Sequence, residues 1–525
     1  MRNKIKCLIA AVVLLFPAFL CSSISKKFAK PNKKKPNIVF ILADDMGYGD
    51  VSCFNENSKI NTPNIDKLAS QGVMFTDAHT SSAVCTPTRY SIMTGRYNWR
   101  STLKKSVLSG YSKSLIKPDR LTIAGFLKNN GYNTGYIGKW HMGWDWAIAD
   151  DTRKDDVDAL DAYPAVDFSR RVKNGPDTHG FDYSYGFCGS LDMAPYVWVE
   201  NGFPTMVPTK TTQNKTKQGW WRKGLTSDDF VHQQILPHIK DKAIAYIKEN
   251  ANGKNPFFLY LPLSAPHTPI IPTKEFEGKS ELDNPYGDFV MEVDWVVGEV
   301  MKTLEEQGLT NNTLIVFTSD NGCSPQANYE QLVSQGHNPS YVFRGHKADI
   351  FEGGHRVPYI VTWAGKIKPA KSDKIICSTD FFATAADIIN ADIPDNVAED
   401  SFSFLLDLGM KSSAEQRKSI IHHSINGSFA FRKGNMKVCF CPGSGGWSDP
   451  KPDSKGIELL PNVQLYNLST DIGEKNNLQL EHPEIVKEFK KELMSIIDNG
   501  RSTAGAKQTN DGTDNWPQLD KLREE

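Results

Sequence analysis

The sequence predicts an α/β fold with a large, mostly parallel sheet sandwiched by helices, followed by a smaller α+β domain that carries an antiparallel sheet. Continuous apolar runs occur at 38–42, 257–261 and 314–318, the pattern of strands buried on both faces. Helical patterns lie between them, at 123–129, 239–249 and 289–306. Strands that alternate with helices indicate parallel βαβ units.

The texture changes after about residue 400, where apolar segments become short and are separated by Gly, Asn and Pro. This pattern is typical of an antiparallel sheet. The expected strands are 429–432, 436–440 and 463–466, and the expected closing helix is 483–498. The tail from about Arg501 is polar, and we expect it to wrap the surface or to be loose.

The amino-terminus resembles an export signal, in which basic residues precede an apolar run at 7–20 that is too short for a membrane span. We expect a signal peptide at 1–23 and an exported protein, periplasmic or secreted, with lipid anchoring at Cys21 as an alternative. The expected parts that follow are a basic linker at 24–35, a catalytic domain at 36–400 and a smaller domain at 401–525.

The charge balance restricts the class of partner. Lys+Arg and Asp+Glu both number 61, and this balance argues against nucleic acid as the main ligand, because duplex binding requires a basic excess or a basic face. The seven cysteines beyond the signal region are odd in number and scattered. They do not resemble a disulfide framework, so we expect at least one unpaired thiol.

Acidic and amide residues follow two of the predicted strands. Asp44 and Asp45 end the first, and Asp320 and Asn321 follow the third. Ligands bind beyond the carboxyl ends of parallel strands, and carboxylate and amide oxygens suit Ca²⁺ or Mg²⁺. Either pair alone is more simply a turn or a helix cap. The two pairs together favour a metal site.

Cys85 precedes a probable helix in the segment Cys85-Thr86-Pro87-Thr88-Arg89. A cysteine at a helix N-terminus is expected to have a lowered pKa, and Arg89, one turn further on, would favour an anion there. The alternative is an inert cysteine in a capped turn.

This segment, with Thr94-Gly95-Arg96 after it, resembles the signature of the type I sulfatases, the formylglycine-dependent arylsulfatase family of the alkaline phosphatase superfamily. The family more often carries Ser at the position of Thr88, and the hydroxyl is kept. The resemblance extends from Pro36 to 465–478. It implies an alkaline phosphatase-like fold, hydrolysis of sulfate esters, and oxidation of Cys85 to formylglycine by a formylglycine-generating or anaerobic sulfatase-maturating enzyme.

Three further segments resemble the family, at 138–143, 264–269 and 343–347. They imply catalytic roles for Lys139 and His141, a second active-site histidine at His267 and a sulfate-binding lysine at Lys347. Our mechanistic hypothesis is that His141 is a base and that His267 donates a proton to the leaving group. The implied catalytic residues are Cys85, Arg89, Lys139, His141, His267 and Lys347, and the implied ligands of Ca²⁺, with Mg²⁺ as the alternative ion, are Asp44, Asp45, Cys85, Asp320 and Asn321.

The substrate is less well defined by the sequence. Tryptophans at 140–221 suggest a sugar, since aromatic faces stack on pyranose rings, although most of them would serve as core. The segment 150–225 is the expected specificity region. The candidate substrate contacts are Trp140, His346, His355 and Arg356, although a structural salt bridge explains Arg356 equally well.

The expected substrate is therefore a sulfated polysaccharide or oligosaccharide, such as ulvan, carrageenan, fucan or glycosaminoglycan fragments, cleaved by a bacterial enzyme. Two alternatives remain: a phosphonate or phosphate ester hydrolase of the same superfamily, and a non-catalytic glycan-binding protein in which Cys85 stays a thiol.

Overall fold

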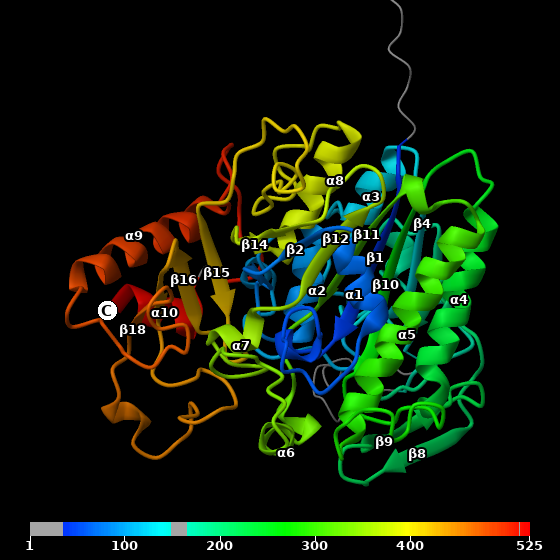
Figure 1. Ribbon diagram of the computed structural model, residues 1–525, viewed down its shortest axis with the longest axis horizontal. Coiled ribbons are helices and arrows are strands. Elements are labelled where there is room, and N and C mark those ends of the chain that lie inside the picture. The colour runs from blue at the N-terminus through cyan, green and yellow to red at the C-terminus, as the bar shows by residue number, and fades with distance from the viewer. Residues whose placement is uncertain (1–34, 149–164, 514, 525) are drawn as a thin grey trace, which may run out of the picture. The chain divides into compact units, whose positions relative to one another are not determined.

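Strand β1, Asn37–Asp44, lies in the middle of a ten-stranded mixed sheet with the order β13-β2-β12-β11-β1-β10-β4-β5-β6-β7 (Figure 1). The computed structural model describes residues 35–148, 165–513 and 515–524. The predicted signal peptide, Cys21 and nearly all of the basic linker lie outside these residues, as does part of the expected specificity region. Within the described residues, no helix combines the length and apolar character needed to cross a membrane.

The five central strands, from β11 to β5, are all parallel to one another, which confirms the prediction of a mostly parallel sheet. The other strands of this sheet are short and largely antiparallel to their neighbours. The strands of the large sheet are β1, β2 (Val73–Phe75), β4 (Asn133–Lys139), β5 (Tyr183–Phe187), β6 (Val199–Glu200), β7 (Phe203–Pro204), β10 (Phe257–Pro266), β11 (Thr313–Ser319), β12 (Tyr359–Trp363) and β13 (Ala370–Ser372).

Helices cover both faces of this sheet (Figure 1). Each predicted helix is present, and α5 starts where Asn284 accepts a hydrogen bond from the Tyr286 amide at 2.9 Å and Pro285 occupies the first turn. One face carries α1 (Pro63–Ser70), α4 (Ile235–Asn250) and α5 (Pro285–Glu306), and the other carries α2 (Cys85–Thr94), α3 (Ile123–Asn129) and α8 (Phe381–Ile389). The short helices α6 (Tyr329–Ser334) and α7 (Glu352–His355) lie in the connection from β11 to β12.

The carboxyl ends of the parallel strands meet at one edge of the sheet. In the register of β1 and β11, Leu42 pairs with Thr318 and Ala43 pairs with Ser319. The polar residues that follow the two strands are therefore neighbours in space, as the sequence predicts.

The carboxyl-terminal part forms a separate antiparallel sheet, packed by α9 (Pro483–Asn499) and α10 (Pro517–Glu524). This confirms the second element of the predicted fold class. Its strands, in order, are β15 (Ser419–His423), β16 (Phe429–Lys433), β17 (Met436–Cys439) and β18 (Gln464–Asn467), and two-stranded pairs elsewhere are β3 (Ala78–His79) with β14 (Ile376–Cys377) and β8 (Lys210–Asn214) with β9 (Trp221–Thr226).

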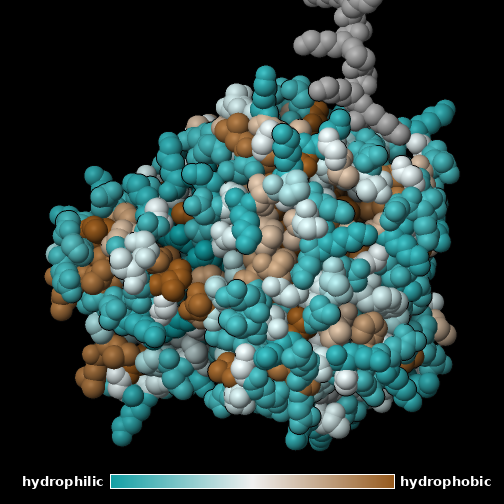
Figure 2. All heavy atoms as spheres, viewed as in Figure 1, coloured by the Kyte–Doolittle hydropathy of each residue, from teal (hydrophilic) through white to brown (hydrophobic). Residues whose placement is uncertain are grey.

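The domain boundary at residue 400 stays a prediction, because 36–525 packs as one unit. The tail is anchored rather than loose: Asp511 forms ion pairs with Arg96 at 2.9 Å and with Lys117 at 2.7 Å. On the face shown in Figure 2 the surface is mainly hydrophilic, and hydrophobic residues gather over the carboxyl-terminal elements.

A buried layer of charged side chains lies where the two sheets meet. Lys437 of β17 pairs with Glu352 of α7 at 3.0 Å and with Glu474 at 2.9 Å. Arg432 of β16 pairs with Asp77 at 2.6 Å. Because an unpaired buried charge is strongly unfavourable, these reciprocal pairs fix how the small sheet packs.

Three imidazoles, of His79, His355 and His422, lie in the same layer, with ring nitrogens within 4.8 Å of one another. A metal site is excluded by their orientation. The rings of His355 and His422 stack face to face, with centroids 3.7 Å apart and planes at 9°, so their in-plane lone pairs cannot converge on one ion. In addition, Lys437 Nζ lies 3.1 Å from His355 Nε2. Burial lowers the pKa of all three imidazoles.

This cluster predicts that acid destabilises the fold. An unfolded histidine has a pKa of about 6.5, and the folded pKa is lower, so the unfolded chain binds more protons once the pH falls below about 6.5. Stability is retained above that pH and is lost below it, by up to about 1.4 kcal/mol per pH unit for each imidazole. The charged groups that face the imidazoles are Asp77, Glu352, Arg432 and Lys437.

We expect the thermal unfolding midpoint to fall between about pH 7 and pH 5, and His422→Phe to make this decrease shallower. The measurement is thermal unfolding by circular dichroism, with His482→Phe on the exposed surface as the control. An unchanged slope in His422→Phe would contradict the expectation.

Candidate active site

Five adjacent parallel strands each contribute a polar side chain at their carboxyl ends. These side chains are Asp320 after β11, Asp44 at the end of β1, His267 after β10, Lys139 at the end of β4 and Ser190 after β5. All of them are buried. The site therefore lies at the position where ligands bind in parallel sheets.

The carboxylates contact one another through backbone and amide groups. The Asp45 amide donates to Asp320 Oδ1 at 3.1 Å, and Asn321 Nδ2 donates to Asp45 Oδ1 at 2.7 Å. Asp45 has a φ of +66°, a left-handed conformation that an Asp tolerates better than most residues. This turn places its carboxylate beside Asn321 rather than continuing the strand.

Three cations balance the three carboxylates. Lys139 Nζ donates to both oxygens of Asp44, at 2.9 and 2.7 Å, and Arg89 donates twice to Asp320 Oδ2, at 3.0 and 2.8 Å. Lys347 Nζ lies 2.8 Å from Asp45 Oδ2. Three of the predicted cationic residues thus meet the predicted metal ligands.

The pKa values in the cluster reflect this crowding. Burial alone would raise the pKa of Asp44, but Lys139, His267 and Arg89 outweigh it and hold that pKa below its usual range. Burial, and then the neighbouring Asp44, raises the pKa of Asp320 to about 7. The two carboxylates repel one another and compete for the same cations.

Cys85 is the first residue of α2, and only 2% of it is exposed. Burial raises the pKa of its thiol, against the lowering effect of Lys139 and Lys347. The expectation of a lowered pKa is therefore wrong, because removal of the thiolate from water outweighs the nearby positive charges. Arg89 follows one turn later and donates from Nη1 to the Lys139 carbonyl at 3.0 Å, which ties α2 to β4.

His141 is held with one ring nitrogen unpaired. Its Nε2 lies 2.9 Å from the Leu108 carbonyl oxygen, which can only accept, so Nε2 carries the proton. Its Nδ1 is buried and has no partner, and burial lowers the pKa of the ring well below its ordinary value. A neutral imidazole with a free lone pair can accept a proton.

Ser190 connects Lys139 with His267 and was not identified from the sequence. Lys139 Nζ donates to Ser190 Oγ at 3.2 Å, and His267 Nε2 lies 3.3 Å from the same oxygen. His267 Nδ1 donates to the Thr268 carbonyl at 2.5 Å, and its Nε2 is 3.7 Å from Asp45 Oδ2. A single serine three residues beyond a strand carries no signal that distinguishes it from a loop serine.

The predicted ligands fit a hard divalent cation. Asp44, Asp45 and Asp320 supply carboxylate oxygens, and Asn321 Oδ1 is buried without a partner. An orphaned acceptor beside mutually repelling carboxylates is the environment that a cation would complete. Oxygen donors favour Ca²⁺ or Mg²⁺ over softer metals.

The predicted substrate contacts are more dispersed. Trp140 is fully buried, and its indole donates to the Gly143 carbonyl at 3.0 Å. His355 belongs to the buried histidine cluster, and Arg356 binds the Thr76 carbonyl and Glu352. His346 is partly exposed and adjacent to Lys347, a catalytic candidate. The roles of these four residues stay predictions, and the contacts of the first three do not support them.

Known proteins share both the sequence and this fold. A sulfatase family model matches residues 36–391. The N-acetylgalactosamine-6-O-sulfatase of Bacteroides thetaiotaomicron is 33% identical over 521 residues, covering 91% of this chain and 96% of the relative. Human arylsulfatase A is 31% identical over 465 residues, covering 85% and 83%.

Two solved structures agree with these relatives. One is a sulfatase structure described with the metabolism of multiple glycosaminoglycans by Bacteroides thetaiotaomicron. It has a TM-score of 0.75 and 33% sequence identity, and the match covers 88% of this chain and 99% of that chain. The other, Ps i-CgsB in complex with a neocarrahexaose, has a TM-score of 0.67 and 25% identity, and covers 93% and 99%. The chain therefore belongs to the sulfatase family and is a sulfuric ester hydrolase.

Proposed function

We propose that the protein removes sulfate from a sulfated oligosaccharide or polysaccharide, using formylglycine made from Cys85 and a bound Ca²⁺. The observation that carries the proposal is the buried cluster in which Arg89, Lys139 and Lys347 converge on the predicted metal ligands beside Cys85. A sulfate ester is an anion, so its site must offer positive charge without being closed by its own carboxylates.

The charges of the cluster fit this requirement. Three carboxylates and three cationic side chains cancel, so a divalent cation held by Asp44, Asp45, Asp320 and Asn321 would leave the site positive. The ion would supply charge that stabilises sulfate oxygens and activates the nucleophile. The ion would also balance the charges of Asp44 and Asp45, which now pair with Lys139 and Lys347. The two ammonium groups would then be available to hydrogen-bond the substrate.

Formylglycine would supply a hydrated aldehyde, of which one hydroxyl attacks sulfur and the other allows sulfate to leave as the aldehyde is restored. Oxidation of Cys85 would require a maturation enzyme of the formylglycine-generating or anaerobic type. A plain serine lacks the second hydroxyl, so its sulfate ester would persist.

We assign His141 as the base of the release step. Its proton is fixed on Nε2 by the Leu108 carbonyl, so Nδ1 accepts the proton from the second hydroxyl. The lowered pKa of this imidazole keeps it neutral before the step.

His267 and Lys347 are assigned to the leaving group. Both lie against Asp45, at 3.7 and 2.7 Å, and His267 also reaches Lys139 through Ser190. His267 would donate the proton as an imidazolium, with Nδ1–H held by the Thr268 carbonyl and the transferred proton on Nε2 beside Asp45, and Lys347 would hold a sulfate oxygen. General acid assistance of this kind is worth about 10²–10⁴-fold in rate.

The relatives favour a glycan. The Bacteroides thetaiotaomicron relative is named for 6-O-sulfated N-acetylgalactosamine, and a neighbouring structure contains a carrageenan-derived hexaose. We therefore propose that the substrate is a sulfated hexose or hexosamine within a glycosaminoglycan or algal galactan fragment. We also propose that the enzyme is exported and acts on this substrate outside the cytoplasm.

The test is sulfate release from a panel of sulfated disaccharides, including N-acetylgalactosamine 6-O-sulfate, measured by ion chromatography beside phosphate and phosphonate esters. Sulfate release from a sulfated sugar supports the proposal. Turnover of phosphonate or phosphate esters alone would place the protein in the other branch of the superfamily, and binding without turnover by protein with an unmodified thiol would indicate a glycan-binding protein.

Cys85→Ser is expected to lower turnover by at least about 10³-fold while the thermal unfolding midpoint stays close to that of the wild type. Peptide mass spectrometry of the wild type should show the oxidised residue at position 85. Cys53→Ser is the control, since Cys53 packs beside Asp66, away from the cluster. Near-normal turnover of Cys85→Ser would refute the nucleophile assignment.

Ca²⁺ is expected to stabilise the folded protein, by about 2.7 kcal/mol at a free concentration 100-fold above Kd. Asp320→Asn should lose this stabilisation, whereas Asp283→Asn, on the surface, should retain it. Thermal unfolding after chelation and re-addition measures the effect without relying on activity. A shift with Mg²⁺ alone would change the assigned ion, and no shift with either ion would contradict the metal site.

A further inference from the structure

The small carboxyl-terminal sheet sends one loop to the active site. The loop 443–448 follows β17 and carries the sequence Gly-Ser-Gly-Gly-Trp-Ser. The ring of Trp447 lies over Lys347, with 6.0 Å between Nζ and the ring centroid. Trp447 is about 100 positions from Lys347 in the sequence and belongs to the other sheet, so only the fold brings them together.

The position of this indole is fixed by the backbone on both sides. The amides of Trp447 and Ser448 donate to Asp349 Oδ1 at 2.8 and 3.0 Å, and the His346 amide donates to Asp349 Oδ2 at 2.9 Å. Asp349 is fully buried. One carboxylate thus holds the Trp447 loop against the segment that carries Lys347.

The approach of the two segments requires glycine. A Cβ on Gly446 would lie 2.4 Å from the Ala348 carbonyl oxygen and 2.5 Å from Asp349 Oδ1. The Ile350 amide also donates to the Ser444 carbonyl at 2.8 Å. The backbone of the loop is therefore fixed at the residue that precedes Trp447, and this fixes the point from which the indole extends.

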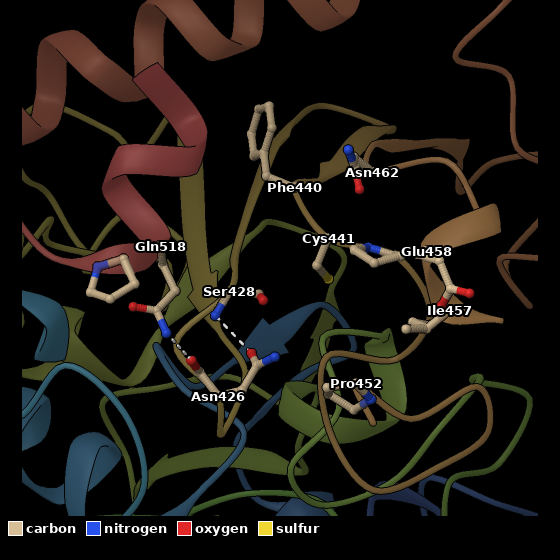
Figure 3. Close-up of a pocket in the computed structure, with 11 residues that line it drawn as sticks. Asn426, Ser428, Phe440, Cys441, Pro452, Ile457, Glu458, Asn462 and Gln518 are labelled. Carbon is tan, nitrogen blue, oxygen red and sulfur yellow. Dashed lines mark hydrogen bonds between the residues drawn. The ribbon is translucent and has the colours of Figure 1, made fainter. Parts of the chain in front are cut away.

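The indole faces the active site rather than the nearby cavity. A cavity of about 480 Å³ lies along the same chain segment and is lined by Cys441, Pro442, Pro452 and Ile457, among others (Figure 3). Trp447 is not among its lining residues. Unlike Trp140, Trp144 and Trp198, which are fully buried, Trp447 is partly exposed, so part of its surface is open to a ligand.

We propose that Trp447 forms one wall of the substrate site and packs against the sugar that carries the sulfate. This inference rests on the proposed function and adds a specificity-determining residue to it. The charge of Lys347 is already balanced by Asp45, so its ion pairing does not account for the indole beside it. A sulfate oxygen bound by Nζ lies about 2.8 Å from that atom, and the indole centroid is 6.0 Å from Nζ, so the sugar attached through that sulfate emerges beside the indole.

Aromatic contact with a pyranose is directional: the apolar face of the sugar meets the ring, and its hydroxyls remain at the edge. The wall would therefore select sugars that offer such a face beside the sulfate ester. Inorganic sulfate, which has no such face, would bind to Lys347 without contacting the indole.

The experiment compares Trp447→Ala and Trp447→Phe with the wild type on N-acetylgalactosamine 6-O-sulfate disaccharide, with inorganic sulfate as competitive inhibitor. We expect Trp447→Ala to raise KM about tenfold or more with a much smaller change in kcat, and Trp447→Phe to restore most of the loss. The inhibition constant of sulfate should change little. Trp295→Ala, which removes another half-buried indole that faces a lysine, is the control and should leave KM unchanged.

An unchanged KM in Trp447→Ala overturns the inference, as does an equal weakening of inorganic sulfate, which would mean that the indole acts by positioning Lys347. Calorimetric binding of the same disaccharide to Cys85→Ser, with and without Trp447→Ala, separates this inference from the proposed function. Binding to Cys85→Ser that depends on Trp447, combined with no sulfate release by the wild type, supports the wall and rejects the proposed reaction. Binding to Cys85→Ser that does not depend on Trp447, or no binding at all, rejects the wall, whereas the proposed reaction is judged by sulfate release from the wild type.

Discussion

The burial of three carboxylates at one edge of a parallel sheet is the constraint on which the rest of this structure depends. Isolated charges in such a position are prohibitively unfavourable, so each must be matched by a cation that the fold delivers to the same point. Arg89 arrives from a helix, Lys139 from the end of a central strand, and Lys347 from the long connection between β11 and β12. The pairs hold together three segments that are distant in the sequence.

The same arrangement explains why the site is reactive rather than merely stable. Asp320 is paired with Arg89, yet burial and Asp44 raise its pKa to about 7, and Asn321 Oδ1 has no partner. The layer between the two sheets also holds buried charges, where Lys437 pairs with both Glu352 and Glu474 and burial raises the pKa of Glu474. The unpartnered amide oxygen beside three carboxylates is what favours a further cation in the first network.

Much of this could be predicted from the sequence, and the reason is physical. A strand buried on both faces must be continuously apolar, so 38–42 and 314–318 were identifiable, and polar residues that follow such strands must lie at a common edge. The helix 123–129 and the strands 429–432 and 436–440 were marked by periodicity and turns. The clustering of Asp44, Asp45, Asp320 and Asn321 followed from these elements.

Other features depend on packing that no local pattern records. The raised pKa of Cys85 follows from its burial, whereas position at a helix N-terminus alone predicts the opposite. Trp140 is fully buried and packs against Tyr136 and Phe181, although its aromatic face suggested a contact with a sugar. Ser190 reaches Lys139 because of the order of the strands. Trp447 reaches Lys347 because of the docking of the second sheet. Neither arrangement can be inferred from the sequence around these residues.

The docking of the small sheet has a consequence for how such a protein can change substrate. Backbone bonds connect β15 directly to the segment before the nucleophile: the Ala83 amide donates to the His423 carbonyl at 2.9 Å, and the His423 amide donates to the Ser81 carbonyl at 3.0 Å. The Ala348 amide donates to the other side of this segment, at the Ala83 carbonyl, at 2.8 Å. The segment before Cys85, the segment that carries Lys347 and the small sheet are therefore joined by main-chain hydrogen bonds. Side chains on loops of that sheet can vary without disturbing the charge cluster, because the contacts that fix their position are made by the main chain. The loops of the small sheet are thus free to differ in sequence while the charge cluster stays the same.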